Sequence, residues 1–258
     1  MRLVVEMTTN NNDSAAIRLS GLTKTYGSGS TAVHALRGVD MTIQRGEVVG
    51  LVGPSGSGKS TLLKCLGAVI EPTDGQIELG GESIFDGKTG GWQIKDLRAL
   101  RRDRIGFIFQ APYLIPFLDV TDNVALLPML AGVPNNEARL RARELIEALD
   151  VGHRAGVRVN MLSGGEQQRV AIARSLVNQP PVILADEPTA PLDSTRALAV
   201  MRILNQMAQR YGAAIIVVTH DEKIIPTFKR IYHICDGRTE EEPGEGREIP
   251  EETGIKIR

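Results

Sequence analysis

The sequence predicts an α/β domain with a mainly parallel core sheet, an N-terminal antiparallel β subdomain and an inserted helical subdomain. Three observations favour this fold. Four near-continuous apolar runs indicate strands that are buried on both faces, as in a parallel sheet covered by helices. Short segments elsewhere alternate apolar and polar residues, which is typical of half-buried antiparallel strands. A long stretch between the second and third runs has apolar residues at helical spacing.

The buried runs are 48–52, 105–109, 182–185 and 215–218, and the alternating segments are 17–19, 39–43 and 77–79. Each buried run is followed by residues that can bind a ligand or take part in a reaction. The first run leads into a glycine loop from Gly53, the second into Gln110, the third into Asp186 with Glu187, and the fourth into Thr219 with His220. Ligands of open α/β sheets bind beyond the carboxyl ends of the strands. The four strand ends therefore predict one shared site.

Three parts are expected along the 258 residues. Residues 7–15 are polar, and residues 1–15 are predicted to be a flexible terminus, although Met7 is an alternative start to Met1. Residues 16–237 form the folded domain, with the helical subdomain at about 111–178. Residues 238–258 are rich in Glu, Gly and Pro, and predict an acidic, disordered tail.

The composition fits a cytoplasmic protein. Hydrophobic residues make up 42%, enough for a sizeable core, and the formal net charge of −1 gives no basic field for nucleic acid. Cys65 and Cys235 lie far apart in the sequence, which indicates reduced thiols. No segment approaches the roughly 18 consecutive apolar residues of a membrane helix, so any membrane part is expected to come from another chain.

The glycine-rich loop matches the phosphate-binding pattern G-x-x-x-x-G-K-[ST], known as Walker A. Glycines let backbone N–H groups curve around phosphates, and the following helix adds its positive end. Lys59 is expected to reach the β- and γ-phosphates of ATP, and the Ser60 hydroxyl to ligate Mg²⁺. The loop residues predicted to bind ATP are Gly53, Pro54, Ser55, Gly56, Ser57, Gly58, Lys59, Ser60 and Thr61.

Two carboxylates end the third buried run. Asp186 is the predicted Mg²⁺ ligand of this Walker B strand, and Glu187 is the predicted general base for the attacking water. Alone, two acids after an apolar run would favour a surface turn. With a phosphate loop upstream, the catalytic interpretation is the stronger one.

A third segment, Leu162-Ser163-Gly164-Gly165-Glu166-Gln167-Gln168-Arg169, has the spacing of a helix start. Ser163 and Glu166 are placed as in a capping box, and an apolar face follows. Its glycines would let an anion approach the helix N-terminus, although capping alone favours an ordinary helix.

This segment closely resembles the signature of the ATP-binding-cassette (ABC) family, and the resemblance covers about residues 17–237. It implies that two such domains work as a pair. It also implies that Ser163, Gly164, Gly165 and Glu166 contact the ATP held by the opposite subunit.

The resemblance assigns further roles residue by residue. Tyr26 is similar to the aromatic residue that stacks on adenine, and Gln110 to the glutamine that approaches Mg²⁺ and reports to a membrane partner. His220 resembles the histidine that holds the γ-phosphate and the attacking water, and Asp193 lies in the loop that crosses between subunits. Pro191 departs from the family pattern in that loop, because proline is rigid and lacks an N–H.

The implied function is an ATP-hydrolysing subunit that powers a separate membrane permease. The pattern is most similar to the macrolide-export, lipoprotein-release and heterocyst glycolipid-export subgroup, which favours export. The implied partners are a second copy of the chain, an integral membrane permease and, in some such systems, a periplasmic adaptor protein. The expected location is the cytoplasmic face of the membrane. The apolar segment 111–118 fits a permease contact and local core equally well. The sequence does not indicate which cargo is transported.

Two alternatives stay open from the sequence. One is a soluble single-cassette ATPase of the iron–sulphur assembly or DNA-repair type. The length of the chain permits the iron–sulphur type, whereas DNA-repair relatives carry long coiled coils or zinc-binding cysteines that this sequence lacks. The other is a degenerate subunit that binds ATP without hydrolysis. This second alternative is disfavoured because all the polar residues of the hydrolytic machinery are present: Lys59, Gln110, Asp186, Glu187 and His220.

Overall fold

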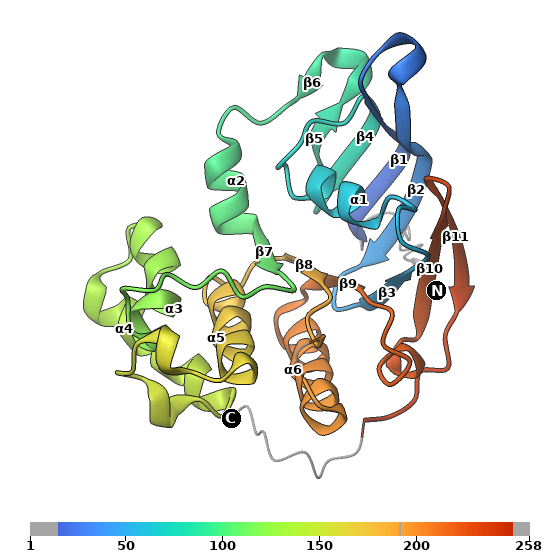
Figure 1. Cartoon of the computed structure of the whole chain (residues 1–258). Helices are drawn as coiled ribbons and strands as arrows, with labels where there is room; N and C mark the ends of the chain where they lie inside the picture. Colours follow the sequence, from blue (N-terminus) through green and yellow to red (C-terminus); the bar gives the residue numbers. More distant parts are fainter. Residues whose placement is uncertain (1–14, 191, 250–258) are drawn as a thin grey trace, which may run out of the picture.

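The computed structural model describes residues 15–190 and 192–249. Its core is a six-stranded sheet in the order β11-β10-β3-β9-β8-β7 (Figure 1). Every neighbouring pair in this sheet is parallel except β10 and β11. The strands are β3 (Val48–Val52), β7 (Ile105–Ile108), β8 (Val182–Asp186), β9 (Ala214–Val218), β10 (Arg230–Cys235) and β11 (Arg238–Pro243).

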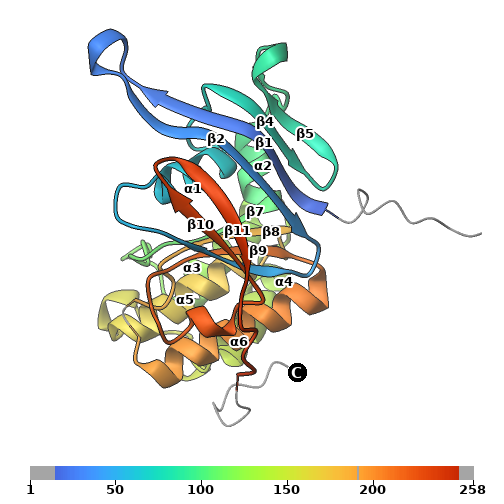
Figure 2. The ribbon, with the colours of Figure 1, turned by 90° about the vertical axis from the view of Figure 1, so that its right-hand side faces the viewer.

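The second sheet is antiparallel and has the order β2-β1-β4-β5-β6. Two long strands dominate it and cross the core sheet, as Figure 2 shows. The strands are β1 (Ala15–Tyr26), β2 (Val33–Gln44), β4 (Asp74–Leu79), β5 (Glu82–Asp86) and β6 (Gly91–Trp92).

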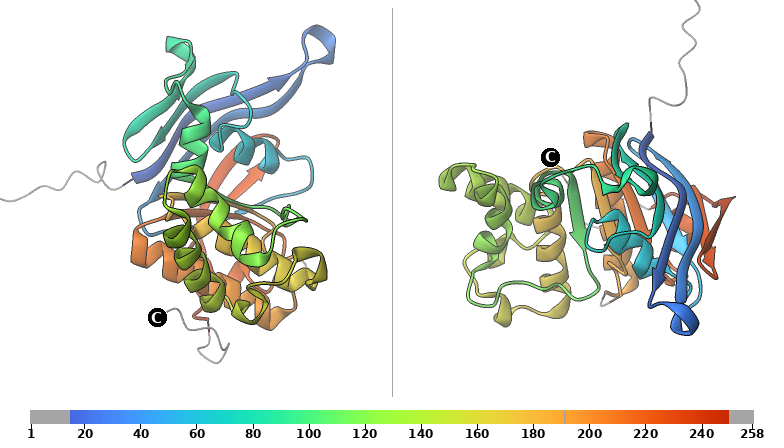
Figure 3. Two further views of the ribbon diagram at one scale, coloured as in Figure 1. Left: turned by 90° about the vertical axis from the view of Figure 1, so that its left-hand side faces the viewer. Right: turned by 90° about the horizontal axis from the view of Figure 1, so that it is seen from above.

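The helices fall into two groups. One group lies against the core strands: α1 (Lys59–Leu66), α2 (Leu97–Arg104) and α6 (Ser194–Tyr211). The other forms the helical subdomain between β7 and β8, which lies at the front of the left view in Figure 3: α3 (Val120–Leu130), α4 (Asn135–Ala148) and α5 (Gly164–Leu176). Single 3₁₀ turns occur at Gly29–Thr31, Gly87–Thr89, Gly152–Arg154, Val159–Met161 and Ile225–Thr227.

Strand alternation divides the core between two sides of the central sheet. Ile183 and Ala185 of β8 pack with the helical side, whereas Val182 and Leu184 pack with α1 and the antiparallel sheet. A central strand buried on both faces has to be apolar at every position, which explains the continuous runs in the sequence. The predicted fold class is confirmed.

The predicted disorder from residue 238 is wrong for the first part of the tail. Arg238–Pro243 forms β11, which pairs antiparallel with β10 along its whole length. The chain then stays tied to the domain, because the amide of Gly244 donates to the carbonyl of Lys229 and Arg202 donates to the carbonyl of Ile249. A highly charged strand is stable here because it is an edge strand, with one side solvated. Residues 250–258 lie outside the described residues.

The predicted flexible N-terminus, 1–15, is wrong at its last residue, because Ala15 is buried and begins β1. Residues 1–14 lie outside the described residues.

Candidate functional site

The carboxyl ends of β3, β7, β8 and β9 meet at one edge of the core sheet because these strands are parallel and adjacent. The register aligns Leu51 of β3 with Val218 of β9, and Val218 with Asp186 of β8. The fold therefore brings the predicted phosphate loop, the two carboxylates and His220 to the same edge. Gln110 follows β7 at this edge and is exposed.

The phosphate loop turns directly into a helix. Gly58, in a left-handed conformation, is the N-cap of α1, and Lys59 is the first helical residue. The ammonium group of Lys59 folds back over the loop and donates to the carbonyl oxygens of Gly53 and Pro54, each at 2.7 Å. A cation and free helical N–H groups therefore face the same small space, which suits a phosphate.

An oxygen cluster lies beside the loop. The Ser60 hydroxyl lies 3.5 Å from a carboxylate oxygen of Asp186. Burial and the neighbouring carboxylate of Glu187 raise the pKa of Asp186. Hard cations such as Mg²⁺ prefer oxygen ligands of this kind and would relieve that burial cost. The buried Ser57 hydroxyl has no partner within the described part of the chain. These groups fit a magnesium–phosphate ligand.

Glu187 and His220 form a pair at the ends of adjacent strands. The Nδ1 atom of His220 lies 2.6 Å from Oε1 of Glu187. Glu187 has a left-handed φ of 49°, a conformation that costs energy in residues other than glycine and is concentrated at functional sites. Its amide donates to the carbonyl of Val218, which fixes this turn. The carboxylate is 14% exposed and the imidazole 79% exposed, so the pair lies at the surface with the acid inward.

A buried glutamine of α5 joins two loops of the site, and the sequence-based interpretation assigned it no role. The side-chain amide of Gln168 donates to the carbonyls of Phe109 and Pro188, both at 3.0 Å. One group therefore holds the residue before Gln110 and the residue after Glu187. A glutamine on the mainly apolar buried face of α5 was the signal that could have indicated this, because buried amides require partners.

The capping box at the start of α5 is confirmed. The amide of Glu166 donates to the Ser163 hydroxyl at 3.3 Å, and the amide of Ser163 donates to the Glu166 carboxylate at 2.8 Å. Among the described residues, no recorded hydrogen bond or ion pair joins 163–166 to 53–61. The first segment begins α5 in the helical subdomain, whereas the second leads from β3 into α1 beside the core sheet (Figure 1).

The remaining predicted residues lie on the surface. Tyr26 ends β1 and is 42% exposed, with the Lys24 ammonium 5.2 Å from the ring centre. Asp193 is the N-cap of α6 and pairs with Arg196 at 2.9 Å. Pro191 lies outside the described residues. The predicted adenine and subunit-crossing roles of Tyr26 and Asp193 stay predictions.

Residues 36–190, which include the phosphate loop, the α5 start and both carboxylates, match the family model described as ABC transporter. The chain belongs to this family. It is an ATP-binding subunit and an ATPase, as the sequence resemblance predicted.

Relatives agree with this assignment. The ABC subunit is 42% identical over 221 residues to the lipoprotein-releasing system ATP-binding protein LolD of Bacteroides fragilis, covering 86% of this chain and 98% of that protein. It is 44% identical to the pyoverdine export ATP-binding/permease protein PvdT of Pseudomonas fluorescens, covering 86% of this chain but 33% of that longer protein. The comparisons give no support to a soluble iron–sulphur or DNA-repair ATPase.

A solved structure shows the same cassette fold. The ABC subunit resembles the dimeric post-hydrolysis structure of the cassette MJ0796 bound to ADP and Pi, with a TM-score of 0.79 and 38% identity over 90% of this chain and 99% of that one. The described part of the ABC subunit has no helix both long and apolar enough to span a bilayer.

Glu166 of the ABC subunit provides a pH test of the α5 cap. Hydrogen bonds from the Ser163 amide and the Arg154 guanidinium lower its pKa from 4.5 to about 2. A depressed folded-state pKa stabilises the fold above pH 4.5, and this stabilisation is lost as the pH falls towards 2. Glu166→Gln is therefore expected to lower the free energy of unfolding by about 1 kcal/mol at pH 7.

The measurement is urea unfolding of both proteins at pH 7 and at pH 3. The difference between them is expected to shrink at pH 3. A difference that is equal at both pH values would show that the charge of Glu166 does not stabilise the cap.

Proposed function

We propose that the chain is the ATPase motor of an ABC exporter whose membrane-spanning part is a separate permease. Two copies bind two ATP molecules between them. Each site takes its phosphate loop from one copy and Ser163 to Glu166 from the other. ATP binding draws the copies together, hydrolysis lets them part, and this motion drives the permease.

The proposal of a composite site is supported mainly by where the phosphate loop and the start of α5 lie in the fold. The phosphate loop and the α5 start both present helix N-termini suited to an anion, yet they belong to different subdomains of one chain. A second copy, related by a two-fold axis, would supply the missing half to each site. The dimeric structure of the MJ0796 cassette supports this arrangement.

Contacts at the sheet edge support the roles of Lys59, Ser60, Asp186, Glu187 and His220, and the family resemblance supports those of Gln110, Tyr26 and Asp193. Lys59 neutralises the phosphates, and Ser60, Asp186 and Gln110 would hold Mg²⁺, which would polarise the phosphoryl oxygens when bound. Glu187 accepts the proton of the attacking water, and His220 orients that carboxylate through the contact of 2.6 Å. Tyr26 stacks on adenine, and Asp193 contacts the second copy.

A surface beside Gln110 is our candidate for the permease contact. Tyr113 is 71% exposed and Phe117 is 76% exposed, whereas Leu114 packs against the helical core. Segment 111–118 is therefore divided between residues that pack on the core and residues exposed to a partner. Exposed aromatic residues close together are typical of partner sites.

This surface is connected to the composite site through α5. The Arg174 guanidinium donates to the carbonyls of Pro112 and Tyr113, both at 2.8 Å, and Gln168 of the same helix holds Phe109. The helix that these two residues lie on begins at the segment proposed to contact the opposite ATP. A force on Tyr113 would therefore be carried to that segment through fixed contacts.

The printed name of one relative supports a location and a direction of transport. PvdT is named as an export ATP-binding/permease protein, which supports a permease partner and export here. We therefore place the chain at the cytoplasmic face of the membrane, bound through its permease. A periplasmic adaptor is the further partner that this class of exporter suggests.

Co-purification from detergent-solubilised membranes of the source organism tests this function. The tagged protein is expected to retain an integral membrane protein in stoichiometric amount, and Tyr113→Ser/Phe117→Ser to reduce its recovery about tenfold or more. Leu140→Ser, at a 58% exposed apolar residue of α4, is the matched control and should retain the partner. Recovery that is equal in all three proteins would contradict the proposed surface, and the absence of any membrane protein would contradict the transport function.

A further inference from the structure

The phosphate loop is backed by a segment from the far end of the chain, the turn between β10 and β11. The amide of Gly237 in this turn donates to the carbonyl of Ser57 at 3.1 Å. The carbonyl of Gly237 accepts from the amide of Arg37 in β2 at 2.8 Å. The turn therefore connects the loop to the antiparallel sheet.

The end of β10 is also in direct contact with the start of the loop. A Cβ atom added at Gly53 would lie 2.2 Å from the carbonyl oxygen of Ile234, so these two backbones touch. The position of the β10–β11 hairpin therefore limits where the phosphate loop can lie.

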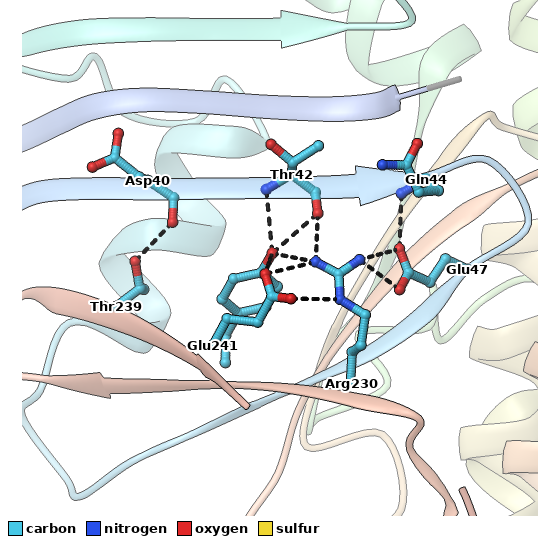
Figure 4. Close-up of polar contacts among 8 residues, drawn as sticks. Asp40, Thr42, Gln44, Glu47, Arg230, Thr239 and Glu241 are labelled. Carbon is cyan, nitrogen blue, oxygen red and sulfur yellow. Dashed lines mark hydrogen bonds and ion pairs between the residues drawn. The ribbon is translucent and has the colours of Figure 1, made fainter. Parts of the chain in front are cut away.

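At its other end, the hairpin is fixed by a polar cluster centred on Arg230 (Figure 4). The guanidinium group donates to both carboxylate oxygens of Glu47, at 2.7 and 2.9 Å, and to Glu241 at 2.7 and 3.0 Å. It also donates to the carbonyl of Thr42 in β2 at 3.0 Å. Arg230 thus joins β10 to β11, to β2 and to the residue just before β3.

Tyr232 completes the cluster. Its hydroxyl lies 2.7 Å from Glu241 and 3.0 Å from the carbonyl of Thr42. Hydrogen bonds from Arg230 and Tyr232 lower the pKa of the Glu241 carboxyl, so the ion pair persists at neutral pH. Further along β11, the hydroxyl of Thr239 donates to the carbonyl of Asp40 at 2.9 Å. Arg230 and Tyr232 of β10 each contact Glu241 of β11 and Thr42 of β2, and they therefore hold β11 against the antiparallel sheet.

We propose that the β10–β11 hairpin is a positioning element for the phosphate loop. The Arg230–Glu241 cluster fixes the hairpin, and the Gly237 turn fixes Ser57, so that the loop amides keep the curvature needed for phosphate. The proposal rests on ATP binding by this loop and is independent of transport. The strand that the sequence predicted as disordered is thus part of the nucleotide site's support.

Binding of Mg·ADP to the purified single chain tests this proposal. ADP contacts the phosphate loop without requiring the second copy or a permease, so failure of the proposed transport function cannot change the result. The first variant is Glu241→Ala, which removes the carboxylate that pairs with Arg230 on the exposed edge strand. The second is Gly237→Ala: the backbone there has a left-handed φ of 75°, and the added Cβ would lie 2.8 Å from the Ala35 carbonyl oxygen. Glu240→Ala is the matched control, because neighbouring strand residues face opposite sides.

Glu241→Ala and Gly237→Ala are expected to weaken ADP binding by about threefold to tenfold, the range for losing one or two hydrogen bonds that hold the loop. Glu240→Ala should bind ADP as the unmodified protein does. Amide hydrogen exchange of residues 53–60 without nucleotide should accelerate in the first two proteins relative to that of α6, which distinguishes loop loosening from general destabilisation.

Unchanged ADP affinity in Glu241→Ala would overturn the proposal, whatever Gly237→Ala does. Equal weakening in Glu240→Ala, or exchange that accelerates equally in α6, would overturn it too.

Discussion

Glu187→Gln is expected to bind ATP normally and to lose almost all ATP turnover. Glutamine has the same shape and can still contact His220, but its amide cannot accept a proton from the attacking water. The turn at φ 49° and the Glu187 amide bond to Val218 do not depend on the side-chain charge, so the geometry of the site should survive. Stalled hydrolysis should leave the two copies joined around ATP.

Loss of a positioned general base typically lowers the rate by about 10²- to 10⁴-fold, and a decrease of that size is expected in steady-state phosphate release. Light scattering should show an ATP-dependent dimer that persists in the variant. Glu222→Gln, at an exposed acid two residues beyond His220, is the control and should hydrolyse ATP normally. Turnover that is unchanged in Glu187→Gln would remove Glu187 from the role of base.

Lys59→Met is expected to weaken ATP binding strongly and therefore to lower ATP hydrolysis. The methionine side chain fills a similar volume without the ammonium group. That group now lies 2.7 Å from the Gly53 and Pro54 carbonyls, within the curve of the loop. Its loss removes charge-assisted hydrogen bonds to phosphate, each of about 1.5–3 kcal/mol, which corresponds to a decrease in affinity of about 100-fold.

Equilibrium titration with Mg·ATP gives the affinity of this variant. Lys64→Met, an exposed lysine later in α1, tests whether any lysine of that helix has the same effect and should bind ATP nearly normally. Comparable affinity in Lys59→Met and the unmodified protein would show that the loop binds phosphate through its backbone alone.

Much of this site was predictable because its parts are local in sequence. A buried strand followed by a glycine loop and a helix places Lys59 and Ser60 without any long-range information. The capping box of Ser163 and Glu166 is likewise a pattern within four consecutive residues. Asp186, Glu187 and His220 were found because parallel strands align their carboxyl ends.

The parts that the sequence did not predict depend on contacts between distant residues. Arg230 pairs with Glu47, 183 positions away, and no local pattern connects them. The acidic composition of β11 indicated disorder, yet pairing with β10 and the charge of Arg230 stabilise it as an edge strand. Gln168 lay within a motif, but its two carbonyl partners follow β7 and β8 and became apparent only in the fold.

Intersubunit cross-linking tests the composite site most directly. One protein carries Ser55→Cys in the phosphate loop, and the other carries Met161→Cys, a 71% exposed position just before Ser163. Both also carry Cys235→Ser, because Cys235 is exposed whereas Cys65 is buried. The two are mixed in the Glu187→Gln background and treated with a short thiol cross-linker.

If each site is shared between copies, ATP should produce a product of twice the chain mass that contains one chain of each kind. The absence of any mixed product in the presence of ATP would contradict the composite site.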